Sequence, residues 1–141
     1  MTVSQFYAYA SILIFVPWAL LIAAPRWRYT EILAFLTALG LSLAAAFFTY
    51  EFLTDEARQG NLLSFEGMKN LFRHPAMLLT GWFNYLSFSL LVGIWLVSDA
   101  RSNRLPHWLV VPVLVLTLLG GPVGALVYLG LRSFKTGKWR I

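Results

Sequence analysis

The sequence contains no cysteine, which excludes disulfide bonds and thiolate metal ligands. It is also poor in charge, because Asp, Glu, Lys and Arg make up only 12% of its 141 residues, about half their share in an average soluble domain. Neither a metal-ligand cluster nor a nucleophile elbow nor a phosphate-binding glycine loop occurs in it. A chain with so little charge has too few polar side chains to cover a core in water.

Hydrophobic residues take the place of the missing charge. They make up 59% of the chain, and the mean hydropathy is +0.69, which is typical of a protein that resides in lipid. The apolar segments do not alternate with a period of two, as the strands of a membrane barrel would, so they are expected to be helices. The sequence therefore predicts an all-α integral membrane protein in the lipid bilayer, with residues 1–141 forming a single domain.

Four segments are apolar over roughly the 20 residues that a membrane-spanning helix needs. They lie at about residues 5–24, 31–53, 76–98 and 107–131. Only helices and closed barrels satisfy their backbone groups inside a bilayer. The expected fold is therefore a four-transmembrane-helix bundle.

A short helix is predicted between the second and third spans. Ser64 precedes it and is placed to cap its first turn. Its apolar face comprises Phe65, Met68, Leu71 and Phe72. We expect this helix to lie in the membrane interface, although the same pattern would suit a lid over the bundle.

The distribution of Lys and Arg indicates the orientation in the membrane, because cytoplasmic loops carry an excess of both. Seven would lie on the side of the N-terminus: Arg58, Lys69, Arg73, Arg132, Lys135, Lys138 and Arg140. Four would lie on the other side: Arg26, Arg28, Arg101 and Arg104. The sequence therefore predicts a multi-pass protein of a bacterial inner or photosynthetic membrane, with both termini in the cytoplasm. The basic C-terminal tail, residues 132–141, suits an anionic leaflet and does not indicate binding of nucleic acid.

Small residues indicate where helices approach one another. In the second span a stripe of them recurs every four positions: Ala34, Ala38, Ser42 and Ala46. Such a stripe allows close approach of a neighbouring helix. In the fourth span, Gly121 and Pro122 predict a kink or an unwound turn, since proline lacks a backbone donor. The functional alternative is that this turn forms the wall of a ligand groove.

The third span carries polar side chains where a bilayer is driest. Asn84 and Ser87 fall on one stripe of the helix, whereas Ser89 lies about 140 degrees from Asn84. An Asn that bonds across helices contributes about 0.6–2 kcal/mol, and a Ser hydroxyl bonds readily to a carbonyl one turn back. Helix packing and contact with a ligand therefore both remain open for these residues.

Residues scattered over the spans and loops carry a family resemblance. They are Pro17-Trp18, Pro25, Gly67, Leu71-Phe72, Gly81-Trp82, Asp99, Pro112, Gly121-Pro122, Gly124 and Arg132. On these positions the chain resembles, over about residues 5–132, the abscisic-acid-deficient-four-like family of small four-helix membrane proteins. The resemblance implies a role with carotenoids, because the plant members act in the formation of neoxanthin from violaxanthin in plastid membranes.

The third span departs from the family pattern of tryptophan, any residue and histidine, then aspartate five positions on and arginine five after that. Here the histidine, aspartate and arginine positions hold Asn84, Ser89 and Ile94. Turning an epoxide into an allenic alcohol would need proton transfer, which Asn and Ser cannot supply as His and Asp do. The sequence therefore favours a protein that holds a carotenoid or a lipid without converting it.

The leading hypothesis is a non-catalytic subunit of a larger pigment-bearing membrane assembly, photosynthetic or other, that packs against other integral membrane subunits and contacts a carotenoid. The alternative is a carotenoid-modifying enzyme, a xanthophyll isomerase or epoxide-opening enzyme like the plant relatives. A (bacterio)chlorophyll contact ranks third, with the Asn84 oxygen as the magnesium ligand. The candidate ligand-binding residues, for carotenoid and lipid, are Trp82, Asn84, Ser87, Ser89, Gly121 and Pro122. No catalytic or metal-binding residue is assigned.

Overall fold

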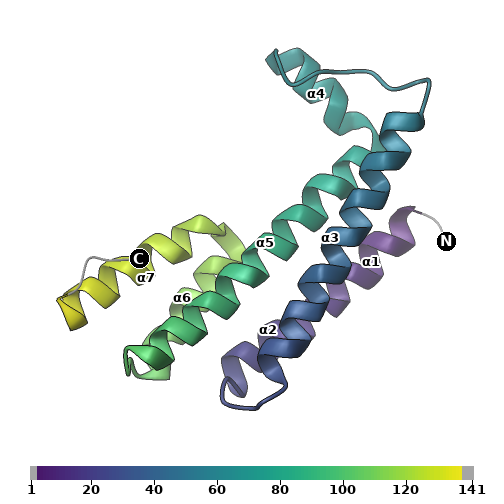
Figure 1. Ribbon diagram of the computed structural model, residues 1–141. Helices are drawn as coiled ribbons and strands as arrows, with labels where there is room; N and C mark the ends of the chain where they lie inside the picture. Colours follow the sequence, from purple (N-terminus) through teal and green to yellow (C-terminus); the bar gives the residue numbers. More distant parts are fainter. Residues whose placement is uncertain (1–2, 138–141) are drawn as a thin grey trace.

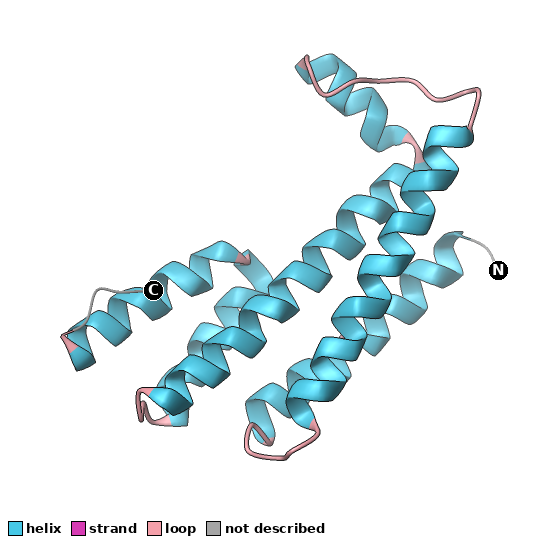
Figure 2. Ribbon diagram, viewed as in Figure 1, coloured by secondary structure: helices cyan, strands magenta, loops and turns pink. Residues whose placement is uncertain are grey.

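The computed structural model describes residues 3–137, and Figure 2 shows these residues as helices joined by loops, without a strand. The helices in chain order are α1 (Val3–Leu13), α2 (Phe15–Ala23), α3 (Thr30–Thr54), α4 (Phe65–Arg73), α5 (Pro75–Ser102), α6 (His107–Gly120) and α7 (Pro122–Thr136). Figure 1 shows α3 and α5 side by side, with α1 and α2 against this pair and α6 and α7 beyond α5. The predicted all-α fold class is confirmed.

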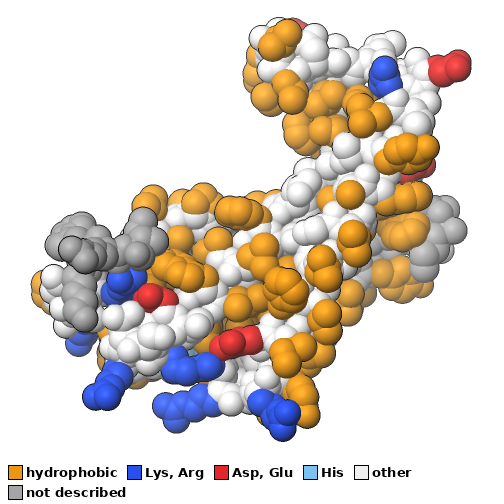
Figure 3. Space-filling view, viewed as in Figure 1, with side chains coloured by type: hydrophobic (Ala, Val, Ile, Leu, Met, Phe, Trp, Pro, Cys, Tyr) orange, Lys and Arg blue, Asp and Glu red, His pale blue; other side chains and the backbone are white. Residues whose placement is uncertain are grey.

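Three helical segments of the described chain are long and apolar enough to cross a membrane. They are Ser4–Ala23, Thr30–Thr54 and Pro75–Ser102. These segments match the first three predicted spans to within a few residues. Hydrophobic side chains are spread over the outer face of the bundle between its two ends (Figure 3). Both observations agree with a protein that lies in a lipid bilayer.

The first span is bent rather than straight. A turn at Ile14 separates α1 from α2. Pro17 explains the turn, because a proline ring clashes with the carbonyl of the fourth residue before it, here Leu13, and offers no N–H for a helical hydrogen bond. Trp18 is buried beside Gly93 of α5, where an added Cβ would stand 3.0 Å from the indole ring. The bend thus packs the Trp18 side chain against α5 at a position where glycine leaves space for it.

α3 packs on α5 through one face. The buried apolar residues of that face are Ala34, Ala38, Leu41, Ala45, Phe48 and Phe52. Their steps of three and four residues follow the helical period of 3.6 residues. The predicted stripe with strict four-residue steps therefore holds for Ala34 and Ala38. It reaches the edge of the interface at Ser42, whose hydroxyl contacts Ser87 of α5, and leaves it at Ala46, which is exposed. Small side chains bring the two helices close at one end, and phenylalanines fill the space at the other.

The short helix between the second and third spans, α4, forms as expected. The Ser64 hydroxyl oxygen accepts a hydrogen bond from the Gly67 N–H at 3.0 Å, which caps the first turn. Leu71 is buried, whereas Phe65 and Met68 are exposed. Figure 1 shows α4 at one end of the bundle, which is where a helix in the membrane interface would lie.

The loop before α4 is held by a contact between a carboxylate and a histidine. His74 Nε2 donates a hydrogen bond to Asp55 Oδ2 at 2.8 Å. This bond, with a second from the Ala57 N–H, lowers the pKa of the Asp55 carboxyl below its ordinary value. The contact ties the end of α3 to the start of α5, so the two ends of the connection between them, which includes this loop and α4, are fixed near one another.

The fourth predicted span, residues 107–131, is not a single helix. At Gly121 the backbone turns with φ 52° and ψ −109°, which favours glycine, and Pro122 begins a new helix. α6 has 14 residues, so it is about 21 Å long and shorter than the roughly 30 Å hydrocarbon core. The predicted unwound turn is confirmed, whereas a fourth transmembrane helix is not.

α6 and α7 form a hairpin that turns back toward the end of the bundle at which it started. Near its tip, the Tyr85 hydroxyl of α5 donates a hydrogen bond to the Leu118 carbonyl at 2.9 Å. At its open end, Tyr128 and Arg132 of α7 bond to Asp99 near the end of α5. The end of α7 therefore lies at the same end of the bundle as the start of α6, as Figure 1 also shows.

Gly124 allows the two helices of the hairpin to meet. A Cβ added at this position would overlap Thr117 Oγ1 and would stand 2.5 Å from the Thr117 backbone nitrogen. The Thr117 hydroxyl cannot easily move away, because it is buried and donates to the Val113 carbonyl at 2.8 Å. The packing of α6 on α7 thus depends on the absence of a side chain at Gly124.

We expect Gly124→Ala to lower the thermal stability of the purified protein, because the methyl group must push α7 off α6, and overpacking of this kind costs about 1–3 kcal/mol. Gly130→Ala is the matched control, since it lies in the same helix and an added Cβ there meets nothing within 4 Å. That variant should equal the parent or gain up to about 1 kcal/mol from the better helix propensity of alanine. Unfolding midpoints in detergent compare the two, and equal midpoints would speak against the close approach.

The hairpin also decides where the basic residues lie. One end of the bundle, called the basic end below, carries Arg26, Arg28, Arg101, Arg104, Arg132 and Lys135. The opposite end carries Arg58, Lys69 and Arg73. Figure 3 shows most of the Lys and Arg side chains in view gathered at the basic end. Lys138 and Arg140, which the orientation count also used, lie outside the described residues.

The prediction that both termini lie on the same side of the membrane depends on a fourth span. The α6–α7 hairpin takes the place of that span. The described chain begins near the end of the bundle opposite the basic end, since the ring of Phe6 in α1 packs edge to face with that of Phe48 toward the end of α3. It leaves α7 at the basic end. With this arrangement, the start and the finish of the described chain lie at opposite ends of the bundle and not at the same end.

Candidate functional site

Ser87, one of the predicted ligand contacts, lies in the seam between α3 and α5. Its hydroxyl donates to the Ala38 carbonyl at 2.7 Å and lies 2.7 Å from the Ser42 hydroxyl. Because a hydroxyl has one hydrogen, Ser42 must be the donor in the second bond. Ser87 is buried, so its polar group joins two helices.

Asn84 and Ser89 make their hydrogen bonds within α5. The Asn84 amide nitrogen donates to the Thr80 carbonyl at 3.0 Å, and the side chain is exposed on the outside of the bundle. The buried Ser89 hydroxyl donates to the Leu86 carbonyl at 3.0 Å. Asn84 and Ser87 share a stripe, yet one faces outward and the other inward, because the edge of the interface with α3 runs between them.

Two apolar grooves flank α1. The larger, here the α1–α3 groove, has a volume of about 520 Å³ and is lined by α1, by α3 and by Phe83 of α5. Its aromatic side chains are Phe6, Tyr9 and Phe83. Gly40 of α3 lies in its wall, and an added Cβ there would meet nothing within 4 Å.

The smaller groove, here the α1–α6 groove, has a volume of about 320 Å³. Trp82 lies in it, stacked on Tyr85 with ring centroids 5.8 Å apart, and the Tyr7 ring lies 6.1 Å from Trp82. None of the residues that line either groove is Asp, Glu, His, Lys or Arg. Both grooves therefore suit an apolar ligand.

The remaining candidate residues lie at the tip of the hairpin. Gly121 is buried next to Tyr85, with 3.4 Å between an added Cβ and the ring, and Pro122 is exposed in the first turn of α7. Of the six residues predicted to bind a ligand, Trp82 is the one that lines one of the two grooves. The other five are engaged in the helices or lie outside these grooves.

A buried polar cluster at the basic end was not foreseen from the sequence. The Asp99 carboxylate accepts hydrogen bonds from the Tyr128 hydroxyl at 2.5 Å, from Asn103 Nδ2 at 3.1 Å and from Arg132 Nη1 at 3.3 Å. The Arg132 side chain is 8% exposed and that of Asp99 is 19% exposed. Because its oxygens are already occupied, Asp99 acts here as an anchor between α5 and α7.

The sequence alone does not bring Asp99 and Arg132 together, because its hydropathy predicts α6 and α7 as one span. With that span, the two residues would lie on opposite sides of the membrane. A signal that connects them was nevertheless present, since both positions belong to the residues that carry the family resemblance. Gly124 and Trp18 belong to the same set, and each of them makes a close contact between helices.

Both histidines are engaged at one ring nitrogen. His107 Nε2 donates to the Ile22 carbonyl at 2.7 Å, and His74 Nε2 donates to Asp55. Within residues 3–137, no group of three or more His, Cys, Asp or Glu side chains is placed to hold a metal ion. The two histidines thus connect helices and loops.

Three apolar helices of membrane length, a broken helical hairpin and two apolar grooves define a small all-α membrane protein with space for apolar ligands. Comparison with protein families gives a more specific result. The chain belongs to the ABA DEFICIENT 4-like family, whose profile matches residues 5–128. Searches of curated proteins and of solved structures each gave no match. The family resemblance found in the sequence is confirmed, and membership indicates a carotenoid-related membrane protein.

Proposed function

We propose that this protein binds a carotenoid in the α1–α3 groove and holds it without converting it. The observation that carries the proposal is the groove itself. Its volume of about 520 Å³ falls within the roughly 300–1,000 Å³ of small-molecule sites. Leucines and the rings of Phe6, Tyr9 and Phe83 line it, which suits a polyene chain. It lies along α1 and α3, so an apolar molecule reaches it directly from the bilayer.

The absence of conversion is supported by the positions that carry charge in the family pattern. Asn84, at the histidine position, is exposed and bonded within its own helix. Ser89, at the aspartate position, is buried and bonded to Leu86. Opening an epoxide needs an acid or a base within hydrogen-bond reach of the substrate. The side chains along the α1–α3 groove supply no carboxylate, imidazole or ammonium group.

We further propose that the protein is a subunit of a larger pigment-bearing membrane assembly. Asn84 supports this, because its side-chain oxygen faces outward near the middle of the third span and has no hydrogen-bond partner among the described residues. A polar group that faces hydrocarbon is unfavourable, and a donor on a helix of another subunit would satisfy it. The partner proposed here is therefore a membrane helix that packs over this face of α5.

The orientation that we propose places the basic end in the cytoplasm. The positive-inside tendency favours the side with more Lys and Arg close to the spans. The basic end carries six such residues among those described and the opposite end three. The start of α1 then faces the other side of the membrane, and the end of α7 faces the cytoplasm.

Gly40→Leu is expected to lower the carotenoid-to-protein ratio severalfold. The new side chain occupies the α1–α3 groove, and no atom of the protein lies in its way at the Cβ. Gly130→Leu is the control, because it adds the same side chain to an exposed position outside the groove. The parent and both variants, tagged at the N-terminus, are purified in mild detergent from a carotenoid-producing host and compared by visible absorption.

Carotenoid bands in the parent and in Gly130→Leu, but weak ones in Gly40→Leu, would support the proposed site. A colourless parent would overturn carotenoid binding. Equal carotenoid-to-protein ratios in all three proteins would show that the carotenoid binds outside this groove. Conversion of an added epoxy-xanthophyll by the purified parent would overturn the non-catalytic role and favour the enzyme alternative.

A further inference from the structure

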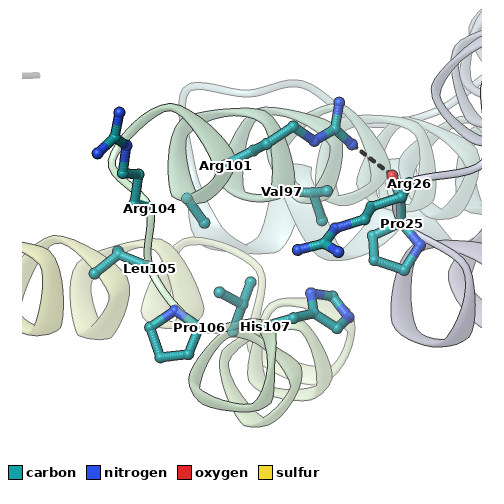
Figure 4. A pocket seen from close by; sticks show the side chains of 10 residues that line it. Pro25, Arg26, Val97, Arg101, Arg104, Leu105, Pro106 and His107 are labelled. Atoms are coloured by element: carbon teal, nitrogen blue, oxygen red, sulfur yellow. Dashed lines mark hydrogen bonds between the residues drawn. The ribbon is translucent and has the colours of Figure 1, made fainter.

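A cavity of about 310 Å³ opens at the basic end of the bundle, between the end of α5, the start of α6 and the loop after α2. Three arginines line it: Arg26, Arg101 and Arg104. In Figure 4 the Arg26 guanidinium lies in the space between α5 and α6, and Arg104 stands on the opposite rim. We refer to this cavity as the arginine pocket.

The positive charge of the arginine pocket is only partly balanced by the protein. Arg101 pairs with Glu31 at 3.0 Å, and its guanidinium also donates to the Pro25 carbonyl. Arg26 and Arg104 have no carboxylate partner within the described residues. Asp99, the other acidic residue at this end, is held by the cluster described above. Two guanidinium groups thus remain available to an anion.

The backbone conformation of Arg104 also distinguishes this pocket. Arg104 has a φ of 54°, in the left-handed region. Its N–H bonds to the Arg101 carbonyl, and the Leu105 N–H bonds to the Ala100 carbonyl. This pair of bonds is the Schellman motif, in which the left-handed position is usually glycine. The chain therefore carries an arginine where its own backbone favours glycine. This arginine stands at the rim of a pocket that two other arginines line, and in Figure 4 its guanidinium points outward from the rim.

The rest of the pocket favours an amphiphile over a free ion. Val97, Leu105 and Val110 form an apolar wall beside the arginines. The pocket lies at the ends of the apolar helices, the depth at which the headgroups of a bilayer lie. His107 forms part of the wall, but its Nε2 is already bonded to the Ile22 carbonyl. Guanidinium groups are the preferred partners of phosphate, and basic pockets between membrane helices bind lipid headgroups.

We propose that the arginine pocket binds the phosphate of an anionic phospholipid, with Arg26 as the donor inside the pocket and Arg104 as the second donor once its long side chain turns inward from the rim. Arg101, fixed by Glu31 and by the Pro25 carbonyl, adds charge at the rim. The acyl chains would run along the apolar wall into the bilayer. This site is separate from the α1–α3 groove, so a carotenoid and this lipid occupy different parts of the molecule.

Arg104→Gly tests the site without disturbing the fold. Glycine is the favoured residue at a left-handed helix end, so the variant removes the charge while it relaxes the backbone. We expect its lipid-free unfolding midpoint in detergent to equal or exceed that of the parent. Its affinity for phosphatidylglycerol should fall about tenfold, as for the loss of one charge-assisted hydrogen bond. Arg26→Gln, in a loop, is a second variant with the same expected loss.

Three comparisons decide the proposal, each with unfolding midpoints measured over a titration of additive. Phosphatidylglycerol must stabilise the parent more than phosphatidylcholine with the same acyl chains, and an equal effect would overturn the proposal. Arg58→Gly, at the opposite end, removes the same net charge and must keep the affinity of the parent. If it loses as much as Arg104→Gly, the effect is a general one of charge. Inorganic phosphate that stabilises as well as phosphatidylglycerol would overturn the lipid as the source of the phosphate.

Discussion

Asp99→Ala is expected to destabilise the protein by about 3–5 kcal/mol, which is the cost of removing one member of a buried ion pair. The variant leaves Arg132 as a buried charge and takes the acceptor from Tyr128 and Asn103. It also releases α7 from α5 at the open end of the hairpin. Thermal unfolding of purified protein in detergent measures the loss.

Two further variants separate burial from charge. Glu31→Ala breaks the ion pair between Glu31 and Arg101. The Glu31 side chain is 38% exposed and that of Arg101 is 50% exposed, so the loss should cost about 1 kcal/mol or less. Asp99→Ala combined with Arg132→Met should cost less than the sum of the two single changes, because the buried charge of Arg132 is then removed together with the carboxylate that it pairs with. Equal losses for Asp99→Ala and Glu31→Ala would contradict the buried pair.

A reporter inserted between residues 55 and 64 and one fused after residue 137 are expected to lie on opposite sides of the membrane. Three crossing helices followed by a hairpin require this, whereas four crossing helices would place both reporters on the same side. With the orientation proposed above, green fluorescent protein fused after residue 137 fluoresces in the cytoplasm. Alkaline phosphatase inserted in the loop is active on the other side.

Whether the two reporters lie on opposite sides of the membrane tests the hairpin. Which of the two lies in the cytoplasm tests the orientation. Exchange of the two reporters between the two positions is the control, because each must then lose its signal. If both positions favour the same reporter, α6 and α7 cross as one helix and the hairpin is wrong. If the sides differ but in the opposite sense, the hairpin stands and only the proposed orientation falls.

The three long helices could be predicted because their signal is local. Each segment holds about 20 apolar residues in sequence, and a bilayer leaves a backbone of this kind few alternatives to a helix. The capped helix α4 was predictable for the same reason, since Ser64 and Gly67 are three residues apart. Gly121 and Pro122 marked the turn correctly, because both residues act on the backbone next to them.

The direction of the chain after Gly121 could not be predicted in this way. It depends on Gly124 meeting Thr117, and on Tyr128 and Arg132 reaching Asp99, which lies about thirty residues earlier in the chain. A hydropathy pattern contains no information about such contacts. The same limit explains Asn84 and Ser87, because helical spacing shows that they share a stripe but not where the edge of the neighbouring helix falls.

The hairpin has a consequence for how the protein enters the membrane. Moving arginine and lysine side chains through the centre of a bilayer is costly, by about 2.5–3.5 kcal/mol each on insertion scales. In the orientation proposed above, with the basic end in the cytoplasm, a fourth crossing helix would require Arg132 and Lys135 to be translocated after the third span is in place. A hairpin whose open end never leaves the basic end avoids this step, so residues 107–136 need only sink into the bilayer from the side on which they are synthesised. Their insertion can therefore follow that of the first three helices, and the bond from Arg132 to Asp99 then joins α7 to α5.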